Sequence, residues 1–261
     1  MSRQRLPFED RRPMKAKQAR LRFYAELTDL LSPESRSGTV TVGFDVPGSV
    51  KDLIEACGVP HTEVDLILAN GDSVDFSYPV GDGDRISVYP VFESFDITSL
   101  LKVRPRPLRA MRFLADNHLA RLARYLRLLG FDTAHDPLRT DHELVQMSTG
   151  EQRVLLTRDV GLLKHGSVTH GYYVRATDPR QQITEVGHRF HLAGQLHPFT
   201  RCMTCNGKLV AVKKEEVADR LPPLTRERVE EYRCCDSCHQ IYWNGSHHEA
   251  LSRIVDSVAS G

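Results

Sequence analysis

The sequence predicts a protein of the α/β class with several modules, and three observations lead to that prediction. In the middle of the chain, short apolar runs that end on aspartate alternate with helical patterns, as in a parallel sheet. Alternating strand patterns around one short helix come before them, and two Cys-x-x-Cys pairs come after. At 261 residues the chain has room for two or three small domains. We therefore expect a small α+β domain, a parallel-sheet domain and a cysteine-rich module, in that order.

The charge distribution separates these modules. The net charge is only +1, but residues 1–22 hold eight basic side chains against two acidic ones, and residues 23–96 hold three against fourteen. Residues 101–112 hold five basic side chains and no acidic one. The acidic part will not attract nucleic acid, whereas the basic segments either do so or serve as a solvated tail and spacer. The chain shows no membrane-spanning apolar run or export signal, so we expect a cytoplasmic protein with no membrane association.

The first module, residues 21–97, reads as a β-grasp, ubiquitin-like α+β domain after a basic arm at 1–20. Residues 39–44 alternate like a strand, and residues 49–58 read as a helix with Ser49 as N-cap and Gly58 as stop signal. Asn70-Gly71 between two apolar runs predicts a hairpin, and residues 85–91 form the last strand. Cys57 is expected to be a small core residue.

The second module is expected at residues 111–200, after a stiff basic linker at 98–110 that contains Pro105 and Pro107. Leucines and one alanine from 119 to 129 recur at helical spacing, and Gly130 ends that helix. Its other side carries arginines, which form a solvated face or contact phosphate: Arg121, Arg124 and Arg127.

Aspartates follow the expected strands of this module. Asp116, Asp159 and Asp178 each follow an apolar run, and Asp136 and Asp141 lie between the first two. Ligands gather at the carboxyl ends of parallel strands, and clustered carboxylates require a cation such as Mg²⁺ or Mn²⁺. Such a site suits hydrolysis of a phosphodiester. We therefore predict a catalytic metal site, in which the expected ligands are Asp116, Asp141 and Asp159 and the supporting acidic candidates are Glu143 and Asp178.

Several of these side chains have a structural explanation as well. Thr140 and Glu143 match a capping box, and Asp141 in the first turn of a helix suits the helix dipole. Asp136 and Asp178 each precede a proline and also suit a turn. Arg158 is expected either to pair with a site carboxylate or to contact substrate phosphate. For His118 we expect a peripheral role, because no serine or cysteine nucleophile motif accompanies it.

The third module, residues 201–250, is expected to be a zinc ribbon, with a tail at 251–261. Its Cys-x-x-Cys pairs predict a closed tetrahedral zinc site with no open position for catalysis, formed by Cys202, Cys205, Cys235 and Cys238. Cys234 is an alternative to Cys235 with poorer spacing. Tyr242 and Trp243 are expected either to stack on unpaired bases or to cover the thin core of the ribbon.

At these residues the chain resembles a known family. Residues 111–250 resemble the PIN-like nuclease domain at the C-terminus of the mut-seven exonucleases, including its zinc ribbon. Residues 20–97 are similar to the ubiquitin-like domain that precedes this nuclease in many bacterial members. The resemblance is carried by residues 113–116, 119–132, 155–159 and 242–247, by both cysteine pairs, and by residues 49–54, 58–64 and 89–93.

The resemblance implies a PIN-like ribonuclease that uses Mg²⁺ or Mn²⁺, with its acidic positions at Asp116, Asp141 and Asp159. The fourth acidic position has no secure counterpart, since Asp178 and Glu143 compete for it, and this leaves the number of metal ions open. We expect RNA, single-stranded or tRNA-like, as substrate, and a protein partner for the acidic β-grasp domain. The alternatives are a non-catalytic RNA- or ribosome-associated adaptor with a vestigial site and a toxin-like endonuclease held by a partner.

Overall fold

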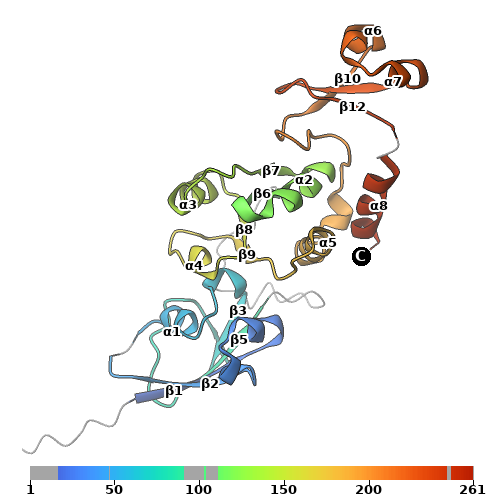
Figure 1. Cartoon of the computed structure of the whole chain (residues 1–261). Coiled ribbons are helices and arrows are strands. Elements are labelled where there is room, and N and C mark those ends of the chain that lie inside the picture. The colour runs from blue at the N-terminus through green and yellow to red at the C-terminus, as the bar shows by residue number, and fades with distance from the viewer. Residues whose placement is uncertain (1–16, 47, 91–102, 104–110, 246–247, 261) are drawn as a thin grey trace, which may run out of the picture. The chain divides into compact units, whose positions relative to one another are not determined.

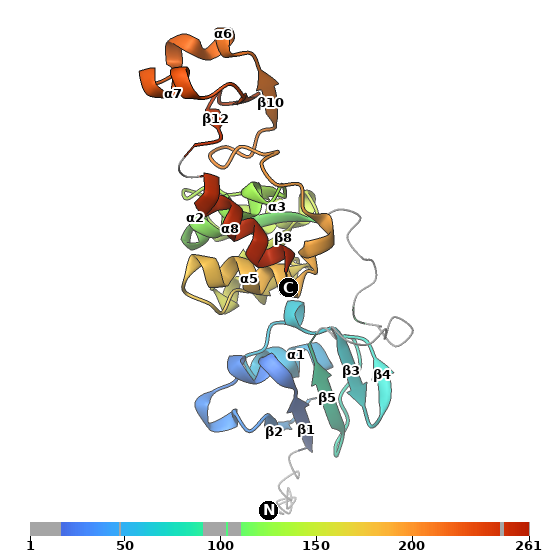
Figure 2. The ribbon, with the colours of Figure 1, turned by 90° about the vertical axis from the view of Figure 1, so that its right-hand side faces the viewer.

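The computed structural model describes residues 17–46, 48–90, 103, 111–245 and 248–260. The chain divides into two compact units, residues 1–105 and residues 106–261, shown in Figures 1 and 2. Each unit has its own hydrophobic core and is described by itself. None of the helices in the described ranges has the length and apolar character that crossing a bilayer requires.

The first unit has the predicted β-grasp architecture. Its sheet has the order β2-β1-β5-β3-β4, and the first and last strands run parallel at its centre. The elements are β1 (Lys17–Phe23), β2 (Thr39–Phe44), α1 (Val50–Ala56), β3 (Leu66–Ala69), β4 (Asp72–Val74) and β5 (Arg85–Tyr89), with 3₁₀ turns at Ala25–Leu30, Pro33–Ser35 and His61–Glu63.

The local signals of this unit act as the sequence predicts. Ser49 caps α1 in a reciprocal capping box with Asp52, and Gly58 follows the helix with φ at +108°. Asn70 and Gly71 both have positive φ in the turn between β3 and β4, as a two-residue hairpin requires. Cys57 is half-buried and packs against the core of the unit.

Strand β1 begins at Lys17, four residues before the domain boundary expected at Leu21. Its apolar side chains Ala19, Leu21 and Phe23 are buried, while Gln18, Arg20 and Arg22 are exposed. The basic residues that suggest an arm are therefore in part the solvent face of a strand, and their charge hides the alternation.

The second unit contains a parallel sheet in the order β7-β6-β8-β9 with helices on both faces. Phe113, Ala115, Val154 and Leu156 belong to the larger core cluster, together with side chains of α2, α5 and α8. Leu114 and Leu155 point to the opposite face and pack with α3 and α4. The elements are β6 (Arg112–Ala115), α2 (Ala120–Leu128), β7 (Asp132–Ala134), α3 (Asp141–Gly150), β8 (Val154–Thr157), α4 (Val160–Leu163), β9 (Gly171–Tyr173), α5 (Pro179–Arg189) and α8 (His248–Ala259), with 3₁₀ turns at Asn117–Leu119 and Leu192–Gln195.

The segment expected as a tail at 251–261 is part of a helix. In α8, Ile254 and Val258 are buried in the core of the parallel-sheet domain. A Cβ atom on Gly187 of α5 would lie 2.8 Å from a methyl carbon of Val258, so the two helices approach closely. The ribbon is thus an insertion between the 3₁₀ turn at Leu192–Gln195 and α8, and the boundary expected at 250 falls inside this helix.

The ribbon itself is a three-stranded antiparallel sheet of β10 (Leu209–Val212), β11 (Tyr232–Cys235) and β12 (Ile241–Trp243). The excursion between β10 and β11 folds into α6 (Lys214–Val217), a 3₁₀ turn (Ala218–Arg220) and α7 (Pro223–Arg228). Its small core consists of Val217, Leu221, Tyr232 and Ile241. Tyr242 and Trp243 do not belong to that cluster.

Candidate active site and metal centre

The topology of the parallel sheet places a crevice beside Asp116. Strand β6 leads into α2 on one face of the sheet, and its neighbour β8 leads into α4 on the other. At such a switch point the two connections diverge and leave a crevice outside the carboxyl ends of the strands. Asp116 directly follows β6, and Asp159 lies two residues after the end of β8.

The structure brings three predicted ligands to this crevice. A cavity of about 330 Å³ opens there, and its lining includes Asp116, Asp141 and Asp159. Residues Asn117, His118, Thr157, Arg158, Val160 and Leu162 complete the wall. Asp141 reaches the cavity from the first turn of α3, which passes on the other side of the crevice.

Asp116 is held in place by groups from two strands. It is buried, with 4% of its surface exposed. One carboxylate oxygen accepts a hydrogen bond from the Thr157 hydroxyl and a longer one, 3.3 Å, from the Arg158 amide. The other oxygen accepts from the His118 amide at 2.9 Å. These donors fix the orientation of the carboxylate, which is the condition for a well-defined ligand.

The other two aspartates are exposed and differently held. Asp159 caps α4 by accepting from the amides of Gly161 and Leu162 at 2.7 and 3.4 Å. Within the described ranges, none of Asp116, Asp141 and Asp159 forms a salt bridge. Three carboxylates thus line one small cavity, and none of them forms a salt bridge with the arginine in its wall, Arg158, which suits a bound divalent ion.

The donor set fits an ion that keeps part of its water shell. Among the described residues, only the four cysteines form a group of three or more His, Cys, Asp or Glu ligand atoms that all lie within 4.8 Å of one another. The three aspartates are spread more widely around the cavity. Mg²⁺ characteristically binds through one or two carboxylates and retains several waters, so the wider spacing agrees with its chemistry.

The two supporting acidic candidates do not line the cavity. Glu143 accepts a hydrogen bond from the Thr140 amide at 2.8 Å in a capping box, and its hydrogen bonds to Thr140 lower its pKa. Asp178 caps α5 by accepting from the amides of Arg180 and Gln181 at 2.9 and 3.2 Å. Their structural explanations therefore hold. Asp136 also lies outside the cavity, where it pairs with Arg139.

The predicted substrate-binding arginines differ in their surroundings. Arg121 and Arg124 are exposed on α2. Arg158 lines the cavity, but one nitrogen of its guanidinium donates to the carbonyl oxygens of Val174, Arg175 and Ala176 at 2.7–2.9 Å. Its guanidinium therefore supports the chain after β9, and in the described part of the chain it forms no salt bridge with a site carboxylate.

Sequence patterns did not assign Thr157 or His118 to the cavity that both residues line. The Thr157 hydroxyl donates to Asp116 and also accepts from the Asp159 amide at 2.9 Å, so it links the two strand ends. A fully buried threonine at the end of an apolar strand is the signal for such a role. His118, expected to be peripheral, is exposed and lines the cavity beside Asp116.

The four predicted cysteines meet in the ribbon. Cys202 and Cys238 have sulfur atoms 3.6 Å apart, and those of Cys205 and Cys235 are 3.3 Å apart. Tetrahedral zinc thiolates place sulfurs about 3.8 Å apart, so the donor set fits zinc. Cys234 is outside this group and its thiol points to a backbone carbonyl. The Tyr242 hydroxyl lies 3.1 Å from the Cys202 sulfur, which commits this side chain to the cysteine site, while Trp243 is 37% exposed.

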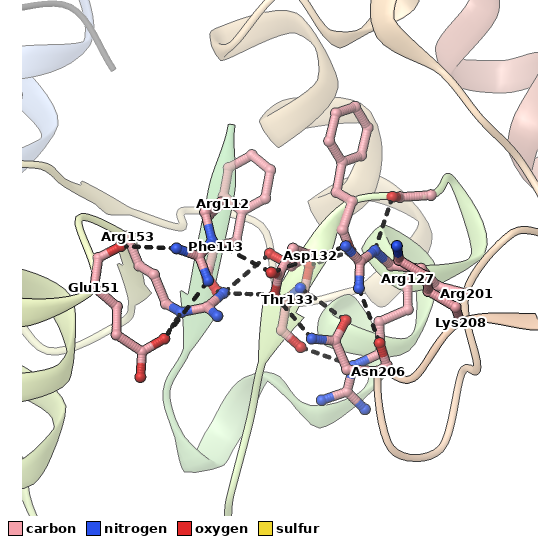
Figure 3. A network of polar contacts seen from close by, with 12 residues as sticks. Arg112, Phe113, Arg127, Asp132, Thr133, Glu151, Arg153, Arg201, Asn206 and Lys208 are labelled. Carbon is pink, nitrogen blue, oxygen red and sulfur yellow. Dashed lines mark hydrogen bonds and ion pairs between the residues drawn. The ribbon is translucent and has the colours of Figure 1, made fainter. Parts of the chain in front are cut away.

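A polar network joins the first cysteine pair to the parallel-sheet domain (Figure 3). Asn206 donates to the Asp132 carboxylate at 2.8 Å and accepts from the Thr133 amide at 3.0 Å. Arg127 donates to the carbonyls of Met203 and Thr204 at 3.2 and 2.8 Å. Arg127 is buried rather than solvated, and burial lowers its pKa against the opposing influence of Cys202 and Cys205.

Asp132 is the acidic centre of this network. Its carboxylate lies 2.7 Å from the buried Arg153 and 3.3 Å from Arg112, and Arg201 lies 3.9 Å away. Despite desolvation, hydrogen bonds from Arg153 and Asn206 hold the pKa of Asp132 at about 2. Because Asp132 pairs with Arg112 at the start of parallel strands, the network lies at the amino edge of the sheet, opposite Asp116.

Comparison with known proteins agrees with these two units. The family model described as the Mut7-C RNAse domain matches residues 111–255, and the model described as Mut7-C ubiquitin matches residues 16–96. No curated protein and no solved structure matches this chain. The RNase-domain match spans the parallel sheet, the acidic cavity, the ribbon and most of α8. The chain therefore belongs to the Mut7-C RNAse domain family and carries the Mut7-C ubiquitin domain ahead of it.

Proposed function

We propose that this protein is a metal-dependent ribonuclease whose reaction takes place in the cavity at the carboxyl edge of the parallel sheet. The observation that carries the proposal is the group of Asp116, Asp141 and Asp159, which line one cavity and form no described salt bridge. Membership of an RNase family makes RNA the expected substrate. Single-stranded RNA and a structured tRNA are the first substrates to examine.

Asp116, Asp141 and Asp159 would hold one or more Mg²⁺ or Mn²⁺ ions. Such an ion supplies an activated water and charge neutralisation at the scissile phosphate. Thr157 keeps the Asp116 carboxylate turned toward the cavity, and Asp159 is fixed by the amides at the start of α4. His118 is placed to donate a hydrogen bond to a phosphate oxygen or to the departing oxygen.

The four cysteines would hold a structural zinc ion, with no position left for a substrate. Trp243 is the exposed aromatic residue of the ribbon and is expected to stack on an unpaired base. Arg121 and Arg124 on α2 are expected to contact phosphate groups.

The test is cleavage of labelled RNA by the purified full chain with Mg²⁺, with Mn²⁺ and without added divalent ion. Asp116→Asn removes the charge of the best-fixed ligand and is expected to lower the cleavage rate by about 100-fold or more. Asp178→Asn is the matched control, because Asp178 is a helix-capping aspartate outside the cavity.

Zinc content must be measured in every sample, since a chelator that removes Mg²⁺ also attacks the cysteine site. Equal cleavage by Asp116→Asn and the wild-type chain, at equal zinc content, would overturn the proposed active site. Tight RNA binding with no cleavage under any metal condition would instead favour the adaptor function.

The acidic ubiquitin-like domain is proposed to bind a protein partner or to keep RNA away from the site. Residues 23–96 carry three basic and fourteen acidic side chains, which repel a polyanion. The fragment 106–261 is a compact unit and is expected to bind RNA more tightly than the full chain does. Equal or weaker RNA binding by the fragment would contradict the shielding role.

A further inference from the structure

Two buried arginines of the nuclease domain differ in how their charge is balanced. Arg153 is 5% exposed and contacts the carboxylates of Asp132 and Glu151, each at 2.7 Å. Arg127 is 4% exposed, and among the residues that the structure describes it has no salt-bridge partner. Its hydrogen bonds go to the carbonyls of Thr133, Met203 and Thr204. Carbonyls carry no full charge, so these hydrogen-bond partners do not neutralise a guanidinium that is costly to bury.

The missing negative charge is available at the cysteine site. Four thiolates around one Zn²⁺ carry a net charge of about −2. Arg127 contacts the loop between the two cysteines of the first pair, Cys202 and Cys205. The zinc centre can therefore supply to Arg127 the kind of counter-charge that Asp132 and Glu151 supply to Arg153.

The peptide units between these cysteines connect the two charges. The carbonyls of Met203 and Thr204, which accept from Arg127, belong to two peptide units of the loop between Cys202 and Cys205. A cation that binds the carbonyl end of a peptide polarises it and makes its N–H a stronger donor. Arg127 is therefore joined to the cysteine loop by hydrogen bonds as well as by the attraction between opposite charges.

We propose that Arg127 is the second-sphere partner of the zinc site, so that zinc binding and the folding of the nuclease sheet are one linked equilibrium. Asn206 forms a second connection, because it joins the loop after Cys205 to Asp132 and Thr133 of β7. Loss of zinc removes the anionic centre beside the loop that Arg127 contacts and loosens the sheet at its amino edge. This inference rests on the zinc site of the proposed function, but on neither RNA nor the acidic cavity.

The first experiment follows the transfer of zinc from the full chain to an excess of a coloured chelator. Arg127→Met is expected to speed the transfer by about 10- to 100-fold, as loss of an outer-sphere partner does at other metal sites. Arg124→Met is the matched control, since Arg124 lies one turn earlier on α2 and is exposed, and its rate is expected to equal that of the wild type.

The second experiment measures amide hydrogen exchange in β6 and β8 of the wild-type chain before and after zinc removal under reducing conditions. The proposal expects protection in these central strands to fall when zinc leaves. Unchanged protection without zinc would overturn the linkage, even if the acidic site proved to be an active nuclease.

Asn206→Gly decides the matter if Arg127→Met does not fold. Asn206 has a φ of +75°, which glycine adopts freely, so the substitution removes the side-chain bridge without straining the loop. We expect zinc transfer to speed up several-fold and the exchange of β6 and β8 to depend less on zinc. Wild-type behaviour in both measurements would overturn the proposal, and purified protein without stoichiometric zinc would overturn the zinc site itself.

Discussion

The two edges of the nuclease sheet both carry buried or half-buried aspartates, but they differ in whether neighbouring arginines balance the negative charge. At the amino edge, Asp132 is surrounded by Arg153, Arg112 and Arg201 and receives a hydrogen bond from Asn206. At the carboxyl edge, Asp116 accepts only neutral donors, and its cavity partners have no described salt bridge either. The charge of Asp132 is thus balanced within the chain, whereas the carboxylates of the cavity have no described salt-bridge partner, as the proposed metal site expects.

The largest expected difference between the edges is in stability. Asp132→Asn leaves the buried Arg153 with one of its two carboxylate partners, Glu151, and is expected to lower the free energy of unfolding by about 2–3 kcal/mol. Asp116→Asn keeps one of the two acceptor oxygens and removes an unbalanced charge, and because these effects oppose each other it is expected to cost only about 1 kcal/mol. Urea unfolding of both variants measures the contrast, and equal losses would break the comparison.

Acid titration tests the same contrast through one group. The pKa of Asp132 is about 2 in the folded chain against 3.8 for the free carboxyl, so its stabilisation is present above pH 4 and is lost as the pH falls toward 2. The contribution is about 2 kcal/mol. The difference in free energy of unfolding between zinc-free wild type and Asp132→Asn, measured from pH 6 to pH 2, should shrink by about that amount in that window. Parallel curves would show that Asp132 does not have this pKa.

Two arginines of the nuclease domain, one bonded to backbone carbonyls and one exposed on α2, offer a comparison with a smaller expected effect on stability. Arg158→Ala removes three hydrogen bonds to carbonyls and is expected to cost about 1–3 kcal/mol of stability. Arg124→Ala removes an exposed side chain and is expected to cost less than about 0.5 kcal/mol while weakening RNA binding. Thermal unfolding and RNA affinity measured side by side separate the two roles. If Arg158→Ala lost RNA affinity without losing stability, the result would favour contact with substrate phosphate as the role of Arg158.

The smallest expected effect separates two aspartates that do the same structural work. Asp159 and Asp178 both cap helices through a pair of backbone amides. Replacing either with alanine is expected to lower the free energy of unfolding by about 1 kcal/mol. Only Asp159→Ala is expected to reduce RNA cleavage, because only Asp159 lines the cavity. Equal cleavage by the two variants would remove Asp159 from the proposed metal site.

Local patterns predicted most of the architecture. Ser49, the Asn70-Gly71 pair and the aspartates after apolar runs act where they stand in the chain, so their signals survive in the sequence. The shared cavity of Asp116 and Asp159 was predicted from their positions after two strands, since parallel strands bring their carboxyl ends together. Glu143 and Asp178 cap helices, and these roles were also readable from neighbouring residues. The sequence left open whether they belong to the site, and the structure shows that neither lines the cavity.

The features that sequence patterns did not predict depend on distant partners. Arg127 has the helical position of a solvated arginine, and it is buried because the ribbon loop at Met203 and Thr204 covers it. Strand β1 carries basic residues on its solvent face, which made it resemble a flexible arm. Ile254 and Val258 follow the ribbon in sequence but pack in the core of the preceding domain. No pattern near these residues contains the information about their partners.

The position of α8 also determines the order in which parts of the nuclease domain can fold during translation. The helix completes the core of the nuclease domain, yet it is translated after all four cysteines of the ribbon. The four cysteines therefore leave the ribosome while the nuclease core still lacks Ile254 and Val258. Domains that finish before the next one begins can fold one by one during translation. Here the nuclease core is completed only after the whole ribbon has emerged, so the cysteine site can assemble before that core is complete.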